Sequence, residues 1–297
     1  MYFLFKVVSL LPLCVLQLIG SWIATLLNSY NSSMKRITQI NLQLAYPHLT
    51  SQQHQALTKS SLKSQCMTYL ESIKIWGMPH KYNVGLIKNT FGEQHLTEAL
   101  NSEKGTIVVL LHLGNWELVN VWLNQYTAPV IMYKPSKNKD INRFMLEARQ
   151  STRATLVPTD ENGVRAIFKH LKQGGLTVIL PDHLPKESGG IYADFFGQNT
   201  LSTTLLSKLA SKTQCNVIGI SCLRNSDTHF DIQCTQLSDN ILSKDLQVSV
   251  NQLNQDVEAM INVAPEQYIW SYKRFRRMLS QQNIYQKNKF KNTINKS

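Results

Sequence analysis

Short apolar runs alternate with amphipathic stretches through the middle of the chain. Four runs rich in β-branched and apolar residues have the length of buried strands: 107–111, 129–135, 155–158 and 176–182. The stretches between them, such as 141–150 and 163–175, repeat apolar positions at helical spacing. Strands that alternate with helices predict an α/β fold with a mainly parallel central sheet flanked by helices. Ligands of such folds bind near the carboxyl ends of the strands.

An almost uncharged apolar run opens the chain. Residues 1–28 carry one charge, Lys6, and the run from 7 to 28 is about as long as a helix that crosses a bilayer. We therefore expect a membrane-anchoring helix within 1–28, with a helix lying in the membrane interface as the alternative. A cleaved signal peptide fits less well, because the amino end lacks a basic cluster. Lys35 and Arg36 follow the run and outweigh Lys6, so the positive-inside tendency places the rest of the chain in the cytoplasm.

The stretch TIVVLLHLGNWELVNVWL (106–123) predicts a strand, a sharp turn and a helix. Gly114 permits the turn, Asn115 is a suitable helix N-cap, and Glu117 falls in the first helical turn, where the helix dipole favours a carboxylate. His112 at the strand end and Glu117 can then face each other. An imidazole held by a carboxylate suits a general base that takes a proton from a hydroxyl. The alternative to a general base is a structural histidine at the strand end that hydrogen-bonds to the backbone.

The remaining stretches complete the expected organisation. Residues 37–84 have a helical pattern, in which Glu71 and Lys74 are spaced for a surface ion pair. The turn-rich segment 183–200 is too long for a simple connection and is expected to shape a site. Alternation on either side of residues 225–227 predicts an antiparallel hairpin. The domain division is then 1–28 for the anchor, 29–280 for the main domain and 281–297 for a basic C-terminal tail.

Charge and chemistry narrow the function classes. A net charge of +12 favours an anionic partner, such as an acidic protein, a phosphorylated substrate or an anionic membrane surface. The chain lacks a recognisable nucleic-acid motif with interleaved aromatic residues, so we expect no nucleic acid. His112, Glu117, Asp182 and His183 are metal-ligand types, but neither an H-E-x-x-H nor a C-x-x-C spacing supports a metal. We therefore expect no metal ion and no dissociable cofactor.

Several separated stretches together resemble the bacterial lipid A late acyltransferases, within the lysophospholipid acyltransferase-like superfamily. The resemblance runs over nearly the whole chain, and the order and spacing of the motifs make it specific. The stretches that carry it are the apolar amino end, NLQLAYPHLT with Glu71 downstream, HLGNWE, YKP, LKQGGLTVILPDH, FFG at 195–197 and APEQYIWSYKRFRR. The resemblance implies a membrane-bound enzyme on the cytoplasmic face of the inner membrane. It would move a fatty acyl chain from acyl carrier protein to a lipid A precursor.

The resemblance also implies roles for single residues. His112 matches the family's catalytic histidine and Glu117 its acidic partner. In that mechanism, backbone N–H groups near Asn115 and a nearby cation would stabilise the oxyanion. The other positions that match substrate or oxyanion contacts are Lys134, Arg149, Asp182 and Arg274, with Asp182 as a structural or a direct contact.

Two positions depart from the family pattern. Lys134 stands where the family has arginine, which keeps the charge but loses the bidentate fork. Tyr272 stands where the family has histidine, so a role that needs an imidazole at this position is in doubt. Two alternatives stay open. One is acylation of another glycolipid or phospholipid, possibly from acyl-CoA. The other is a non-catalytic basic protein of the same fold that binds membranes.

Overall fold

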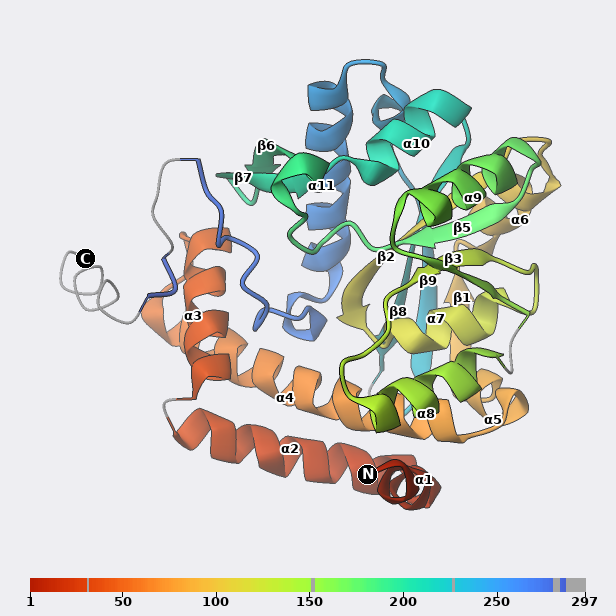
Figure 1. Ribbon diagram of the computed structural model, residues 1–297. Helices are drawn as coiled ribbons and strands as arrows, with labels where there is room; N and C mark the ends of the chain where they lie inside the picture. The colour runs from red at the N-terminus through yellow and green to blue at the C-terminus, as the bar shows by residue number, and fades with distance from the viewer. Residues whose placement is uncertain (31, 151–152, 226–227, 280–283, 287–297) are drawn as a thin grey trace.

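In the computed structural model, a seven-stranded sheet forms the centre of the protein (Figure 1). The structure describes residues 1–30, 32–150, 153–225, 228–279 and 284–286. Its strands lie in the order β1-β9-β8-β2-β5-β3-β4, and all neighbouring pairs are parallel except β8 and β9. The strands of this sheet are β1 (Ile87–Phe91), β2 (Thr106–Gly114), β3 (Val130–Tyr133), β4 (Thr155–Pro158), β5 (Leu176–Ile179), β8 (Asn216–Arg224) and β9 (Phe230–Gln236). The predicted mainly parallel α/β sheet is confirmed.

Helices cover both faces of the sheet. Successive side chains of β2 belong alternately to two core clusters, with Ile107 and Val109 on one face of the sheet and Val108 and Leu110 on the other. The first face packs against α9, α10 and α11, and the second against α6 and α7. The described helices are α1 (Tyr2–Leu10), α2 (Leu13–Ser29), α3 (Ser33–Ala45), α4 (Ser51–Gly77), α5 (His80–Val84), α6 (Glu93–Asn101), α7 (Trp116–Leu123), α8 (Lys139–Gln150), α9 (Glu161–Lys172), α10 (Leu205–Thr213) and α11 (Leu246–Val263).

The segment expected to be a long loop contains regular structure. Residues 183–200 include the short 3-10 helix η1 (Glu187–Gly189), the strand β6 (Gly190–Phe195) and the start of β7 (Gln198–Thr203). β6 and β7 form a separate antiparallel pair. The predicted hairpin further along is confirmed as β8 and β9, although residues 226–227 of its turn lie outside the described part. Two more 3-10 turns, η2 (Asp239–Leu242) and η3 (Pro265–Gln267), flank α11.

The amino end forms two helices rather than one. α1 and α2 meet at Pro12 with a bend of 116°, and α2 runs along α4 (Figure 1). No described helix is by itself long and apolar enough to cross a bilayer, and α1 with α2 meets that test only as a bent pair. α2 buries Leu16 and Gly20 against α4 and exposes Trp22 on its outer face. The single anchoring helix expected over 1–28 is therefore not found in this form.

The prediction of a surface ion pair in α4 was wrong. Glu71 and Lys74 are both buried, with 0% and 3% of their surface exposed. Glu71 pairs with Arg224, whereas Lys74 donates to the carbonyl oxygen of Leu11 at 2.8 Å. The local i, i+3 spacing is compatible with a solvated pair, but the packing of the α1–α2 bend and of β8 against α4 gives each side chain a tertiary partner.

Candidate functional site

His112 and Asp182 meet at the carboxyl ends of two neighbouring parallel strands. β2 pairs directly with β5, so a residue near the end of β2 lies beside a residue that follows β5. The Nδ1 atom of His112 is 3.0 Å from Oδ1 of Asp182, and the backbone N–H of His112 donates to Oδ2 at 2.9 Å. With Nδ1 engaged, Nε2 is the ring nitrogen that can accept a proton from a substrate.

Burial and charge act in opposite directions on this pair. Burial lowers the pKa of His112, but the carboxylates of Asp182 and Glu117 outweigh this effect and raise the pKa above 6.5. Burial raises the pKa of Asp182, but the imidazoles of His112 and His183 outweigh it and bring the pKa to about 2. Asp182 is thus an anion at neutral pH, and it favours the protonated form of His112 that follows proton abstraction.

Two further rings extend the site into a stack. His183 lies on His112 with centroids 3.8 Å apart and planes 3° apart, and Tyr272 lies on the other face of His183 at 3.9 Å. Burial and the neighbouring His112 lower the pKa of His183 to about 4, so this ring is neutral at pH 7. Tyr272, which stands where the family pattern has histidine, therefore contributes an aromatic face. Its hydroxyl also accepts a hydrogen bond from the backbone N–H of Leu184 at 3.0 Å.

The same groups include a possible ligand set for a metal ion. Potential ligand atoms of His112, Asp182 and His183 all lie within 4.8 Å of one another. However, the two imidazole planes are parallel and stacked, so their in-plane lone pairs run side by side instead of converging. Nδ1 of His112 is also directed at Asp182. This geometry fits a hydrogen-bonded base better than a metal centre.

Glu117 lies nearby but has different partners from those expected. It accepts a hydrogen bond from Nη2 of Arg149 at 2.9 Å and another from Nε1 of Trp76 at 3.0 Å. The guanidinium of Arg149 also lies over the ring of Tyr133, 5.2 Å from its centroid. The expected direct contact between His112 and Glu117 is therefore replaced by two separate pairs. The reason is that Glu117 lies in the first turn of α7, beside Trp76 of α4 and Arg149 of α8, whereas Asp182, which follows β5, bonds to His112.

The turn between β2 and α7 is fixed by its backbone. Gly114 has a φ of +60°, and a Cβ atom there would lie 2.1 Å from the carbonyl oxygen of Cys222, so glycine is required. Asn115 is the N-cap residue as predicted, but its side chain makes no capping bond. It donates to Glu71 at 3.3 Å instead, and its N–H donates to Cys222 at 2.7 Å.

An apolar cavity of about 520 Å³ opens beside these groups. Its wall includes His112, Glu117 and Arg149, so one concave surface brings these predicted residues together with Lys134. Most of the lining is aliphatic or aromatic and comes from α1, α4, α8 and strands β2 to β5: Phe5, Trp76, Leu110, Ile131, Phe144, Leu156, Val178 and Leu180 are among these residues. A cavity of this size and character is typical of a site for an apolar ligand with a few polar groups at one end.

The structure places Arg274 elsewhere. Its side chain is buried, with 2% exposed, and it donates to the carbonyl oxygen of Leu201 and to Oγ of Ser202, both at 2.8 Å. The guanidinium also lies over the ring of Phe195, 4.6 Å from its centroid. Arg274 thus holds the β6–β7 pair, and it does not line the apolar cavity as a substrate contact would.

Comparison with known proteins identifies the family of the chain. The family model described as bacterial lipid A biosynthesis acyltransferase matches residues 1–277. The chain belongs to this acyltransferase family. It is 24% identical over 252 residues to a lipid A biosynthesis acyltransferase of Haemophilus influenzae, covering 83% of this chain and 77% of that protein. It is 23% identical over 281 residues to the lipid A biosynthesis palmitoleoyltransferase of Escherichia coli, covering 93% and 90%.

A third relative has a different named acceptor. The chain is 28% identical over 176 residues to the phosphatidylinositol mannoside acyltransferase of Mycolicibacterium smegmatis. This match covers 58% of the chain and 57% of that protein.

Sequence reasoning missed two features of this site. The sequence predicts Asp182 at the end of a strand run, with a structural or a direct role, but a strand end alone does not show that Asp182 lies beside His112. The stack of His112, His183 and Tyr272 was not foreseen, because its members are separated by about 70 and 90 positions in the chain. The pairing of β2 with β5 and the bond from the N–H of Ile269 to the carbonyl oxygen of His112 bring them together.

Proposed function

We propose that this chain transfers a fatty acyl group from the thioester of acyl carrier protein to a hydroxyl of a lipid A precursor. The observation that supports this most directly is the His112–Asp182 pair at the wall of an apolar cavity. A hydroxyl is a poor nucleophile without an adjacent base, and an acyl chain needs an apolar site. The family supplies the reaction class, and this arrangement has the two parts that such a reaction requires.

In the proposed mechanism, Nε2 of His112 takes the proton of the acceptor hydroxyl as its oxygen attacks the thioester carbon. The carbon–oxygen bond forms, and the tetrahedral intermediate then breaks its carbon–sulfur bond. The departing sulfur takes the proton back from the imidazolium. Asp182 stabilises that imidazolium and keeps the ring in one tautomer.

The cavity wall supplies cationic groups for the negative charge that develops. Arg149, held by Glu117, places a guanidinium there, and Lys134 adds an ammonium without the bidentate fork. We assign Glu117 the role of holding Arg149 and of adding a second negative charge that favours the imidazolium of His112. This retains a carboxylate partner for His112 but divides the work between Glu117 and Asp182.

The net charge of +12 supports the choice of donor and acceptor. Acyl carrier proteins are acidic and lipid A precursors carry phosphates, so both would be attracted to a basic protein. An acyl-CoA donor would be attracted as well, which makes the donor comparison part of the test. The proposal requires no dissociable cofactor.

We also propose that the protein lies on the cytoplasmic face of the inner membrane, with α1 and α2 in the plane of the interface. α2 buries one face against α4, while its outer face exposes a row of apolar side chains: Val15, Leu18, Ile19, Trp22, Ile23 and Leu26. A spanning α2 would have to leave α4, which would expose the buried groups beneath it. A helix with one apolar face free binds in the interface.

Two measurements test this location. The double variant Leu18→Glu, Trp22→Glu should float poorly with vesicles that contain anionic phospholipid, whereas Gln52→Glu on the exposed face of α4 should float like the unaltered protein. In a Cys14→Ser background, which removes the exposed native thiol, a cysteine introduced at the exposed Phe3 should react with a membrane-impermeant maleimide in broken cells only. Labelling in intact cells would place the amino end in the periplasm and contradict the in-plane arrangement.

Mass spectrometry of lipid A tests the reaction. Cells that lack this chain, and cells that carry His112→Ala in its place, should both lose one acyl chain from lipid A, and purified His112→Ala should not transfer. Purified protein offered acyl carrier protein and coenzyme A thioesters should prefer the former. A purified His112→Ala enzyme with the wild-type rate would refute the mechanism.

A phosphatidylinositol mannoside-like acceptor is the second candidate, because one relative is named for that substrate. If lipid A were unchanged in deletion and variant cells while purified protein acylated a mannosylated phospholipid through His112, this second acceptor would replace the first.

A further inference from the structure

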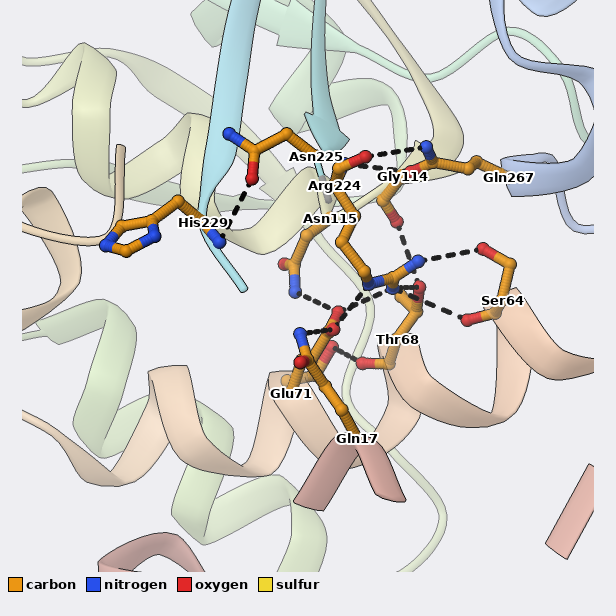
Figure 2. A network of polar contacts seen from close by, with 11 residues as sticks. Gln17, Ser64, Thr68, Glu71, Gly114, Asn115, Arg224, Asn225, His229 and Gln267 are labelled. Carbon is orange, nitrogen blue, oxygen red and sulfur yellow. Dashed lines mark hydrogen bonds and ion pairs between the residues drawn. The ribbon is translucent and has the colours of Figure 1, made fainter. Parts of the chain in front are cut away.

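A buried polar cluster lies beneath the turn that carries His112. At its centre is Glu71 of α4, whose surface is entirely covered. Figure 2 shows its carboxylate facing side chains from three other segments. Glu71 accepts two hydrogen bonds from Arg224 at 2.6 and 2.7 Å, one from Gln17 of α2 at 2.8 Å and one from Asn115 at 3.3 Å. The carboxylate thus joins α2, the β2–α7 turn and the end of β8.

Arg224 completes the cluster from the sheet side. Its Nη1 donates to Oγ of Ser64 at 3.0 Å and its Nη2 to Oγ1 of Thr68 at 2.9 Å (Figure 2). Its backbone N–H and carbonyl both bond to the side-chain amide of Gln267, at 2.9 and 3.0 Å. The guanidinium is therefore held in one orientation by α4, while the segment after α11 holds the backbone of Arg224.

The cluster reaches the catalytic turn at two consecutive residues. Asn115 donates to Glu71, and the hydroxyl of Thr68 donates to the carbonyl oxygen of Gly114 at 3.3 Å. The strand that ends in Arg224 also supplies the carbonyl of Cys222, which accepts from the backbone N–H of Asn115. The turn two and three residues after His112 is thus fixed from below by α4 and from the side by β8.

A buried ion pair of this kind adds little net stability, because desolvation offsets most of the attraction between the charges. What it does add is direction, since each donor must meet its acceptor at a fixed distance and angle. A displacement of about 1 Å at a reacting group can cost about 10²-fold in rate. The consequence expected of the cluster is therefore a defined position for the turn.

We propose that Glu71 and Arg224 are positioning residues of the enzyme, which act through Asn115 and Gly114 to hold His112 against Asp182. This inference rests on the proposed role of His112 as the base. Neither residue lines the apolar cavity, so neither touches the acyl chain. Through Gln17, the same cluster ties α2 to the site.

The test compares Glu71→Gln with Lys74→Met. Both changes remove a buried charge from α4 one turn apart, but Lys74 bonds to Leu11 and not to the turn. Glu71→Gln should lower kcat by about 10²-fold with an unchanged KM for the acyl donor. Lys74→Met should keep kcat per folded molecule, with the folded fraction of each variant measured by thermal unfolding. A wild-type kcat in folded Glu71→Gln would overturn the proposal.

A double-mutant cycle with Asn115→Ala examines the route of the effect. If Glu71 acts through Asn115, the double variant should be little slower than the slower single variant, whereas Lys74→Met and Asn115→Ala should be additive. Full additivity in the first cycle would contradict the route. If Glu71→Gln does not fold, Thr68→Val removes only the hydroxyl that bonds to Gly114 and Arg224. A smaller fall in kcat would then support the proposal, and an unchanged kcat would overturn it.

A spectroscopic measurement separates this proposal from the proposed function. In protein labelled with ¹⁵N-histidine, the Nδ1–H resonance of His112 should move in Glu71→Gln and stay in place in Lys74→Met. An unmoved resonance in both variants would overturn the positioning role even if the enzyme is active. Absence of acyl transfer by the wild-type protein with every donor would refute the proposed function, while the resonance would still report on the positioning of His112.

Discussion

Replacing Asp182 with asparagine tests the central pair of the site. Asp182 has 1% of its surface exposed and approaches His112 three times, through the backbone N–H at 2.9 Å and through Nδ1 at 3.0 and 3.2 Å. Asparagine has the same shape, so the fold should persist. Its amide has one acceptor in place of two and no charge, so it can no longer stabilise the imidazolium or hold a single tautomer.

The expected loss in kcat is about 10³- to 10⁴-fold, the order seen when the buried aspartate of a Ser-His-Asp triad becomes asparagine. This corresponds to about 4 to 5 kcal/mol of transition-state free energy. KM should change little, because Asp182 is not part of the cavity wall. Asp194→Asn, on an exposed position of β6, is the matched control and should keep the wild-type kcat.

The pH dependence gives a second, independent readout. The neutral form of His112 is the base, so the rate should fall as the pH drops through a pKa that lies above 6.5 in the wild-type enzyme. Without the charge of Asp182, burial lowers this pKa, and the acidic limb should move to lower pH. Profiles of kcat/KM between about pH 5 and about pH 9 measure the acidic limb of the wild-type enzyme and that of Asp182→Asn. A loss below about tenfold with an unmoved acidic limb would refute the reasoning.

Three further predictions concern the surroundings of this pair. Glu117→Gln and Arg149→Lys should each lower kcat/KM by about tenfold, and the double variant should lose less than the product of the two, because they share one ion pair; independent losses would contradict this. His183→Phe should keep most of the activity and His183→Ala should not, since the neutral ring of His183 acts by stacking. Equal losses of kcat in the two variants would argue against a stacking role. Gly20→Ala should destabilise the protein by about 1–3 kcal/mol, because its Cβ would lie 2.9 Å from the backbone of Met67; an unchanged Tm would contradict this.

The sheet was predictable because its strands have a strong local signal. The run 107–111 is apolar at every position, and the structure buries it on both faces within β2. The predicted run 155–158 coincides with β4. The order of the strands was not predictable, since pairing depends on contacts between residues far apart in the chain. For this reason the position of His112 at a strand end could be predicted, but its neighbour in space could not.

The choice of carboxylate shows the same limit. Glu117 is five residues from His112 and was the partner that local reasoning could find, whereas Asp182 is 70 residues away and reaches His112 because β5 pairs with β2. The prediction of a surface pair between Glu71 and Lys74 was wrong for the same reason. Their spacing fits a surface pair, but Arg224, 153 residues from Glu71, provides the actual partner.

The amino end shows a different limit. Composition identified the apolar run, but hydropathy alone does not record which face of a helix is covered. Gln17 lies in the middle of the run and would be costly in a bilayer. In the structure it is buried and donates to Glu71 at 2.8 Å. Gln17 thus marks the face of α2 that packs on α4.

Three buried carboxylates surround the turn, and their partners determine which of them can take part in proton transfer. Glu71 pairs with Arg224 and Glu117 pairs with Arg149. A guanidinium offers N–H donors and no acceptor, so these two pairs can orient and stabilise but offer no proton acceptor on the arginine side. Asp182 alone among the three faces a group that gains and loses a proton near neutral pH. The proton transfer that we propose therefore belongs to His112 and Asp182, and the two arginine pairs keep that site in place.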